Sequence, residues 1–443
     1  MYPVSMNVNQ RGHLEIGGCS AVELASKFST PLYIMDEDTL RQSMKAYNDA
    51  FKPKYKNCMA LYASKAFITE AICHILQEEG FGIDVVSGGE LYIALKSGFD
   101  TSKIYFNGNN KSQEELVMAV DNNLGAVIVD NFYELDLLNR IAESKSKKVR
   151  IMLRITPGIE CHTHEYIKTG QIDSKFGFDL TQLDSALEKI VSIYKNLDLQ
   201  GLHAHIGSQI FDLNSYSDLI KIFLEKYSQI KNKYNIELSK LNMGGGFGIK
   251  YTEDDVPPTI QDAAQIVIDA IIKYSEKLGI QLPMLLLEPG RSVVGPAGVT
   301  LYQLGSSKEV PDIRTYVAVD GGMADNPRPA MYGAQYTACI ANKMLEKNKK
   351  LVTVAGRFCE SGDILIKDIE LADPTSGDIL AVFSTGAYNY SMSSNYNFVP
   401  RPACVLVKDG NADIIIERET YQDLVARNKV PSRLLKYKSV AVD

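Results

Sequence analysis

Short apolar segments alternate with longer amphipathic segments through the middle of the chain. Eight apolar segments recur between residues 60 and 290, and each is almost continuously hydrophobic. This pattern is typical of strands in a parallel sheet whose two faces are both covered. Segments 69–78 and 262–278 instead repeat their apolar positions with the period of a helix. The eight strand-like segments are 60–64, 82–86, 103–107, 125–130, 150–155, 201–207, 240–246 and 284–290. Eight such strands alternating with helices predict an α/β fold, a (β/α)8 TIM barrel.

The pattern changes after about residue 290, where short β-rich segments are separated by Gly, Asp and Asn turns. Such segments occur at 315–320, 350–356, 378–383, 403–410 and 412–419. They predict an all-β C-terminal domain, a β-sandwich or small β-barrel, completed by the N-terminal segment. We assign 29–290 to the barrel and 291–443 to the β-domain. We add 1–28 to the β-domain, because segment 13–18 is strand-like and precedes the barrel. A further strand-like segment, 31–36, is interpreted as the lead-in to the barrel from the other domain.

The composition restricts the partners and the compartment. The 443 residues are 45% hydrophobic and carry a net charge of -7, which argues against nucleic acid and an anionic membrane surface as partners. No apolar run is long enough to span a bilayer. The seven cysteines are scattered without CxxC spacing, which favours free thiols in a reducing cytoplasm over disulfides or a zinc site. The first residues lack the order of a signal peptide, so we expect a cytoplasmic protein without a metal centre.

Lys65 directly follows the first apolar strand, in the sequence YASKAF. Active-site groups of such barrels lie at the carboxyl ends of the strands. A solvated lysine is the simpler interpretation, since most lysines are exposed. A lysine in a partly desolvated pocket can instead lose its proton and bond covalently to a carbonyl compound.

A triple glycine, Gly244, Gly245 and Gly246, follows the seventh predicted strand. A tight turn is the simpler reading, but phosphate sites in these barrels often use the loops after strands seven and eight. Bare backbone N–H groups there could cradle a phosphate. The loop after the eighth strand provides Arg291, which could clamp a phosphate or a carboxylate, and Ser208 could add a hydroxyl.

Two further polar residues, His205 and Glu288, end apolar strands. Two histidines in HAHIG cannot both point into the barrel mouth, so we assign a structural role to His203. A buried carboxylate needs a partner, and for Glu288 a protonated pyridine nitrogen would be one, allowing the ring to accept electrons from a departing CO2. Asp84 and Asp130, at other strand ends, are interpreted as supporting or helix-capping residues.

Together these motifs resemble the fold-type III pyridoxal-phosphate enzymes, which include alanine racemases and several amino-acid decarboxylases. The resemblance implies that pyridoxal 5'-phosphate is bound through Lys65, with the imidazole of His205 stacked on the cofactor. The implied cofactor-binding residues are Lys65, His205, Ser208, Gly244, Gly245, Gly246, Glu288, Pro289, Gly290, Arg291 and Tyr388. Racemases of this fold place an arginine at the ring nitrogen, so Glu288 favours a decarboxylase.

Four segments, 162–178, 320–334, 359–363 and 386–402, further resemble the diaminopimelate decarboxylase family within this group. That resemblance implies removal of CO2 from the D-centre of meso-2,6-diaminopimelate to give L-lysine, the last step of lysine biosynthesis. The implied substrate-binding residues are Arg291, Arg328, Tyr332, Glu360 and Tyr388. It also implies a homodimer with shared active sites, in which Cys359 of one subunit donates a proton in the site of the other.

The residues alone leave alternatives open. Arg328 and Tyr332 could lie in an ordinary surface loop, and Cys359 could be a buried core thiol; only the resemblance decides against these readings. A decarboxylase of ornithine, arginine or carboxynorspermidine remains a rival, although two arginines suit a substrate with a second carboxylate. Glu288 argues against a racemase, which has an arginine at that position. The second domain argues against a non-catalytic carrier of the cofactor, because such carriers consist of the barrel alone.

Overall fold

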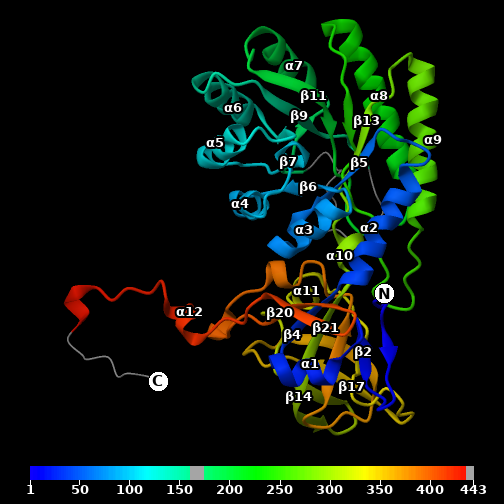
Figure 1. The fold of residues 1–443 in the computed structure, drawn as a ribbon, viewed down its shortest axis with the longest axis vertical. Coiled ribbons are helices and arrows are strands. Elements are labelled where there is room, and N and C mark those ends of the chain that lie inside the picture. Colours follow the sequence, from blue (N-terminus) through cyan, green and yellow to red (C-terminus); the bar gives the residue numbers. More distant parts are fainter. Residues whose placement is uncertain (160–173, 436–443) are drawn as a thin grey trace.

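The computed structural model describes residues 1–159 and 174–435 of the chain. Figure 1 shows two parts along the long axis of the molecule, a strand ring wrapped by helices and a second part built mainly of strands. The chain begins in the second part, passes through the first and then returns. The predicted combination of a (β/α)8 barrel with a β-domain is confirmed.

Eight parallel strands form a closed ring in the barrel. The last strand pairs with the first, and β8 pairs with β9, so the ring has no free edge. Each strand overlaps one of the eight predicted apolar segments. The strands are β5 (Cys58–Ala63), β6 (Gly82–Val85), β7 (Ile104–Phe106), β8 (Ala126–Val129), β9 (Val149–Thr156), β11 (Leu197–His203), β12 (Lys240–Asn242) and β13 (Met284–Leu287). The short β10 (Phe178–Asp179) is added beside β9.

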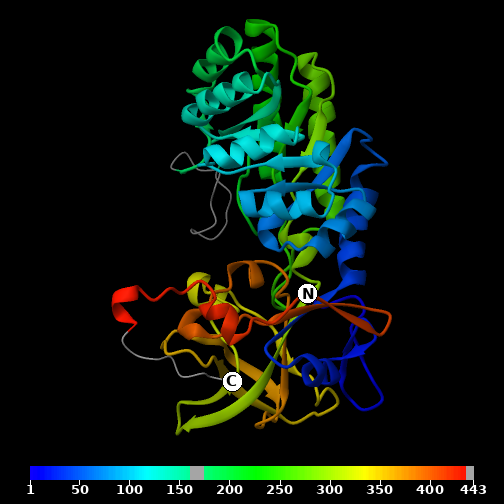
Figure 2. The same ribbon diagram turned by 60° about the vertical axis from the view of Figure 1, so that its left-hand side comes forward.

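Helices cover the outside of the ring, as Figure 2 shows from a second side. They are α3 (Glu70–Glu78), α4 (Gly88–Lys96), α5 (Gln113–Asp121), α6 (Phe132–Ser144), α7 (Leu183–Ser192), α8 (Asn214–Tyr234) and α9 (Ile260–Leu278). The short α10 (Arg291–Val294) follows β13, and α2 (Glu37–Phe51), which precedes the first strand, packs against α9 and α10. No helix in the described ranges is long and apolar enough to cross a membrane.

The interior of the barrel is packed with side chains. Buried residues from five of its strands touch one another there: Leu61, Tyr105, Ala126, Ile128, Met152 and Leu286. A second, larger apolar layer lies between the strands and the helices. A filled interior leaves the strand ends as the place where a ligand site can form.

The second part is a bent sheet around two apolar clusters. Its strand order is β18-β17-β15-β14-β4-β20-β21, and β19 pairs with both β14 and β16. Its strands are β4 (Leu32–Asp36), β14 (Gly298–Val310), β15 (Arg314–Val319), β16 (Ala338–Ile340), β17 (Lys349–Ala355), β18 (Ile364–Ala372), β19 (Ile379–Phe383), β20 (Ala403–Lys408) and β21 (Asn411–Ile416). The helix α11 (Arg328–Tyr332) lies in the connection between β15 and β16.

The N-terminal segment completes this second part. It forms β1 (Asn7–Val8), β2 (Leu14–Ile16), β3 (Cys19–Ser20) and α1 (Ala21–Phe28). Leu14 and Leu24 are buried in one cluster with Val299, Phe383 and Val405, which come from three strands of the C-terminal half. The apolar face of this segment is therefore part of the core of the β-domain.

The hydrogen bonds of β4 bear on the expected domain boundary. A barrel that begins at residue 29 would contain β4, which instead pairs antiparallel with β14 and parallel with β20 in the second sheet. The first element to pack on the barrel is α2, which starts at Glu37. We therefore propose that the barrel extends from near residue 37 to the end of α10 at Val294, which packs on α2, and that 1–36 and the residues after α10 belong to the β-domain.

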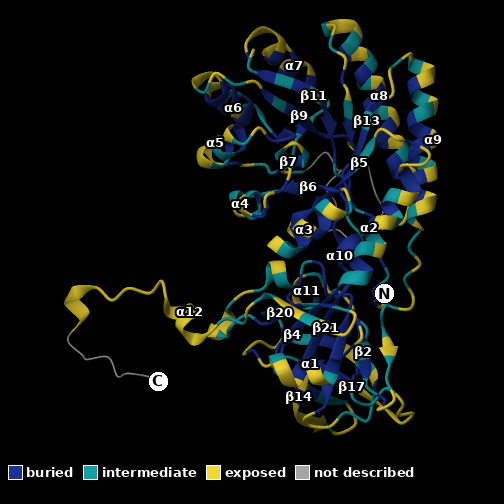
Figure 3. Cartoon of the chain, in the orientation of Figure 1, coloured by how far each residue is buried: buried dark blue, intermediate teal, exposed yellow. Residues whose placement is uncertain are grey.

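The end of the chain leaves the sheet as an arm. After β21 it contains the single-turn helix α12 (Tyr421–Val425), and Figure 3 shows that almost the whole arm is exposed. The described arm contributes no buried residue to either core.

Candidate active site

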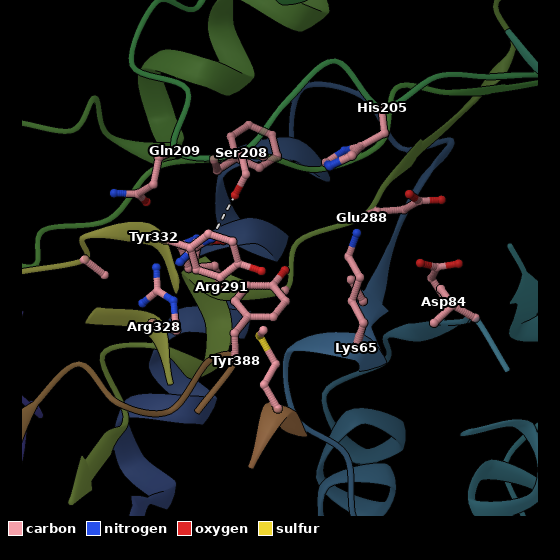
Figure 4. Close-up of a pocket in the computed structure, with 18 of the residues that line it drawn as sticks. Lys65, Asp84, His205, Ser208, Gln209, Glu288, Arg291, Arg328, Tyr332 and Tyr388 are labelled. Carbon is pink, nitrogen blue, oxygen red and sulfur yellow. Dashed lines mark hydrogen bonds between the residues drawn. The ribbon is translucent and has the colours of Figure 1, made fainter. Parts of the chain in front are cut away.

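A cavity of about 1180 Å³ opens at the carboxyl ends of the barrel strands, and residues of the β-domain close its other side. Figure 4 shows how the side chains of the two parts face one another across it. Ten of the predicted site residues line this cavity: Lys65, His205, Ser208, Gly246, Glu288, Gly290, Arg291, Arg328, Tyr332 and Tyr388. The structure thus brings together residues that are more than 300 positions apart in the sequence.

Lys65 lies in a single 3₁₀ turn, Ser64–Ala66, directly after β5. Its amine points toward the space between His205 and Glu288 (Figure 4). The side chain is exposed to the cavity, and no hydrogen bond or ion pair joins its Nζ to another described residue. This differs from the desolvated pocket expected from the sequence, and it leaves the amine accessible to a ligand.

Glu288 follows β13 and is held by three side chains at or beside the ends of other barrel strands. Its Oε1 accepts hydrogen bonds from the amides of Asn242 at 2.8 Å and Asn107 at 3.2 Å. Its Oε2 lies 3.1 Å from Nε2 of His203. The residue is 7% exposed and borders the cavity. We predicted that only one of the two histidines would face the barrel mouth, but His203 and His205 both line the cavity. The contact of His203 with Glu288 supports that carboxylate.

The surroundings of Glu288 keep it ionised. Burial by itself raises the pKa of Glu288, but the imidazole of His203 and the amide of Asn242 outweigh burial and lower it to about 2. For Asp84, burial and the adjacent Glu288 charge raise the pKa well above its ordinary value. The amide nitrogen of Asn107 donates to both carboxyl groups, with 2.5 Å to Oδ1 of Asp84. The cavity therefore holds one fixed anion beside a carboxyl group that favours its neutral form.

His205 lies beyond the end of β11 and borders the cavity. Its Nδ1 accepts a hydrogen bond of 3.3 Å from the backbone of Gly245. Burial, together with the nearby charge of Lys65, lowers its pKa well below the ordinary value. The imidazole is consequently neutral at physiological pH and offers a flat, uncharged face to a ligand.

The glycine loop after β12 approaches other backbone segments too closely for a side chain. A Cβ on Gly245 would lie 2.0 Å from the carbonyl oxygen of Glu288, and a Cβ on Gly246 would lie 2.3 Å from that of Gly207. Gly244 and Gly246 also have φ values of +69° and +100°. Only Gly246 of the three lines the cavity.

The segment after β13 ties the eighth strand to the first. The carbonyl of Pro289 accepts a hydrogen bond of 3.0 Å from the backbone of Ala63. Gly290 lines the cavity, whereas Pro289 does not. This link fixes the position of Lys65 relative to Glu288.

Two arginines lie side by side in the wall of the cavity. Arg291 donates to Oγ of Ser208 at 2.9 Å and to the hydroxyl of Tyr251 at 2.6 Å. Arg328, from the β-domain, donates to the same hydroxyl at 3.0 Å. The guanidinium of Arg291 also lies over the ring of Tyr388, 4.8 Å from its centroid.

Cys359 and Glu360 do not line the cavity of their own chain. Both are exposed on the β-domain. The carboxylate of Glu360 accepts a hydrogen bond from the hydroxyl of Tyr396, and the backbone of Cys359 donates to Asn397. In the described chain the predicted proton donor is therefore separate from Lys65.

Sequence reasoning missed several residues that border the cavity. Arg154 is 8% exposed near the end of β9 and stacks on the ring of Phe176, 4.1 Å from its centroid. Asn107 comes directly after β7, and Asn242 ends β12, behind Glu288. Each interrupts an apolar run near a strand end, which is the signal that identified Glu288. Most of segment 162–178 lies outside the described residues.

The chain is similar to known proteins over nearly its whole length. The family described as "Pyridoxal-dependent decarboxylase, pyridoxal binding domain" matches residues 37–295. Diaminopimelate decarboxylase of Bacillus subtilis is 49% identical over 419 residues, covering 94% of this chain and 95% of that protein. The enzyme of Synechocystis is also 49% identical, covering 98% and 94%.

A solved structure agrees with these sequence relatives. Diaminopimelate decarboxylase of M. jannaschii, in complex with L-lysine, has a TM-score of 0.92 and 38% identity. The alignment covers 98% of this chain and 100% of that one. The chain therefore belongs to the diaminopimelate decarboxylase family of pyridoxal-dependent decarboxylases.

Proposed function

We propose that the protein removes CO2 from meso-2,6-diaminopimelate at its D-centre and releases L-lysine, the last step of lysine biosynthesis. The pair of buried arginines carries this proposal. Arg291 and Arg328 are 8% and 7% exposed, and within the described residues neither forms an ion pair with a carboxylate. Two buried cations without a counter-ion favour an anionic group of the ligand. Diaminopimelate has a second carboxylate that can supply it, whereas ornithine and arginine do not.

The residues around the cavity fit pyridoxal phosphate, the cofactor of the family. The Nε of buried Arg291 has no hydrogen-bond partner within the described chain, and Ser208, which is bonded to Arg291, and the bare backbone at Gly246 also line the cavity. These groups would hold the phosphate. Lys65 would bond to the cofactor, His205 would lie against its ring, and Glu288 would face the ring nitrogen.

When bound, the cofactor supplies a ring that accepts the electrons left by a departing CO2. The chain contributes the conditions for that chemistry. The carboxylate of Glu288, held ionised by the groups behind it, stabilises a proton on the ring nitrogen. Neutral His205 adds no positive charge to the face of the ring. The amine of Lys65 is available to release the product.

The arginine pair acts at the far end of the substrate. Arg291, Arg328 and the hydroxyl of Tyr332 bind the carboxylate that is retained, while Tyr388 borders both this region and that of Lys65. Fixing one end of the substrate orients the other end for reaction. Binding energy at the retained end is thereby used at the end that loses CO2.

We further propose that the protein is a homodimer whose sites are shared. Cys359 and Glu360 lie outside the cavity of their own chain, so a second copy would have to supply them, Cys359 as proton donor and Glu360 beside the distal ammonium. We also propose that the protein is cytoplasmic. Six cysteines of the described chain are free, which favours a reducing compartment.

A direct assay tests the substrate. We expect CO2 release from meso-diaminopimelate to exceed that from ornithine and arginine by several orders of magnitude in kcat/KM. Comparable turnover of ornithine would contradict the proposed role of the arginine pair.

Replacing Arg328 by alanine should weaken binding of diaminopimelate by about 2–5 kcal/mol, because the retained carboxylate loses a buried partner. Cofactor absorbance should remain, since Arg328 lies on the opposite side of the cavity from Lys65 (Figure 4). Steady-state kinetics with the substrate measures the effect. Arg314→Ala, which removes a partly exposed arginine of the same domain that pairs with Asp368, is the matched control. Equal kinetics for the two variants would place Arg328 outside the substrate site.

Replacing Glu288 by glutamine should lower kcat by roughly 10²- to 10³-fold, the usual cost of losing one electrostatic partner of the reacting group. The amide is neutral, so it no longer favours a proton on the ring nitrogen. Because the pKa of Glu288 is lowered, its carboxylate stays ionised down to about pH 2, and the acid limb of the wild-type pH profile should belong to another group. Wild-type turnover by Glu288→Gln would rule out this role.

A further inference from the structure

The hydroxyl of Tyr251 lies between the two arginines of the cavity wall. It accepts hydrogen bonds from NH1 of Arg291 at 2.6 Å and from NH1 of Arg328 at 3.0 Å. Arg291 belongs to the barrel and Arg328 to the β-domain. Tyr251 is 7% exposed and lines the cavity. A single phenol therefore joins the cationic groups of the two domains.

The hydrogen bonds of Tyr251 leave its own proton available. A tyrosine hydroxyl has two acceptor lone pairs and one donor hydrogen, and the two guanidiniums occupy the acceptor positions. No described residue accepts the hydrogen of this hydroxyl. Tyr336 differs, since it accepts from Arg328 but donates to Oδ1 of Asn389. A carboxylate held by the two arginines would be the natural acceptor for the Tyr251 proton.

The loop that carries Tyr251 is fixed on both sides. The side chain of Gln209 accepts from the backbone N–H of Ile249 at 2.9 Å and donates to its carbonyl at 3.1 Å. The carboxylate of Asp255 accepts a hydrogen bond from the backbone N–H of Tyr251. The hydroxyl of Thr337, from the β-domain, donates to the backbone carbonyl of Tyr251. The phenol is thus held in place independently of the arginines.

Charge also favours this arrangement. Burial raises the pKa of the Tyr251 phenol, but the charges of Arg291 and Arg328 outweigh it and lower the pKa below the ordinary value. The partial negative charge on the oxygen of the neutral phenol offsets part of the repulsion between two buried guanidiniums. The other titratable groups nearby are the phenol of Tyr336, which also contacts Arg328, and the carboxylate of Asp255 at the backbone of Tyr251.

We propose that Tyr251 is a positioning and specificity residue that pairs Arg291 with Arg328 and adds its own O–H to the donors that meet on one carboxylate of the ligand. The identity of that carboxylate, the retained end of the substrate, rests on the proposed function. Arg291, Arg328 and Tyr251 come from three separate elements, which are α10, α11 and the loop after β12. Ser208 also holds Arg291 and Tyr336 also holds Arg328, but among the described residues Tyr251 is the side chain that accepts hydrogen bonds from both guanidiniums.

The test compares two ligands that differ in the carboxylate. L-lysine carries it, whereas cadaverine is the same chain without it. We expect Tyr251→Phe to weaken binding of L-lysine to the cofactor-loaded enzyme by about 10- to 100-fold, the usual effect of a hydrogen bond to a charged group. Binding of cadaverine and the cofactor absorbance should not change. Calorimetric titration measures both affinities.

Tyr55→Phe is the matched control, because it removes another buried hydroxyl, one that donates to the carbonyl of Pro283 away from the cavity. Unchanged lysine affinity in Tyr251→Phe, or an equal loss for lysine and cadaverine, would overturn the proposal. Failure of the wild type to bind lysine would count against the proposed function instead.

Ultraviolet titration of the protein without ligand tests the pairing of Tyr251 with the two arginines independently of lysine binding. The wild type should contain one tyrosine that ionises below the ordinary pH range and is missing in Tyr251→Phe, and its absence would overturn the pairing.

Discussion

Replacement of Lys65 by alanine should abolish covalent attachment of pyridoxal phosphate and reduce turnover by at least about 10²- to 10⁴-fold, as expected when a proton-transfer and bonding group is lost. The physical reason is the position of its amine, which is exposed to the cavity and faces the space between His205 and Glu288. Borohydride reduction of the wild type, followed by peptide mapping, should place the cofactor on Lys65.

Two comparisons make this result specific. Lys96→Ala removes an exposed lysine on α4 that pairs with Glu70, and it should keep both label and activity. Lys175 is another lysine that lines the cavity. A reduced cofactor found on Lys175 would show that Lys65 was assigned wrongly.

Mixing two inactive variants should restore activity if the sites are shared. Lys65→Ala lacks the bonding amine, and Cys359→Ala lacks the proposed proton donor, so each variant alone should be nearly inactive. When the two proteins are dissociated, mixed equally and reassembled, about half of the dimers contain one chain of each kind. Each mixed dimer has one site with both groups and one site with neither, so about a quarter of wild-type activity should return.

The composition of the dimers must be measured together with activity. Differently tagged chains allow the mixed species to be isolated and counted. If mixed dimers form and remain inactive, Cys359 does not act across subunits. The control is a chain that carries both Lys65→Ala and Cys359→Ala. In a dimer of this chain with the wild type, one site lacks Lys65 and the other lacks Cys359, so neither site should be active.

Much of the barrel and its site could be predicted because one rule covers both. Continuous apolar runs predicted all eight strands, and the residues that follow such runs lie at one end of a parallel barrel. Lys65, His205 and Glu288 were identified in this way and do border one cavity. Asn107 and Arg154 also follow or interrupt buried apolar runs. The same rule would therefore have identified these two residues, which border the cavity as well.

Residues on long connections could not be placed by that rule. Tyr251 lies in a loop of no regular pattern, and its role depends on Arg328, which is 77 positions away. The pattern of β4 leaves the boundary between the two domains open for a similar reason. A short apolar strand has the same pattern in either sheet, and only its partners β14 and β20 decide to which sheet it belongs. If the sites are shared as proposed, the position of Cys359 relative to Lys65 depends on contacts between chains, which one sequence does not encode in any local pattern.

The placement of β4 has a consequence for the order in which the polypeptide folds during synthesis. Every strand of the barrel has left the ribosome well before β20, which begins at Ala403. The barrel can therefore close while β4, made earlier, still lacks one of the two neighbours between which it lies. The β-domain can be completed only by the C-terminal strands, so a chain that stops before residue 403 would keep an intact barrel beside an open sheet edge. Arg328 and Tyr388 depend on that sheet for their positions. In the nascent protein, the barrel residues proposed to hold the cofactor are therefore placed first, and the β-domain residues proposed to bind the substrate are placed last.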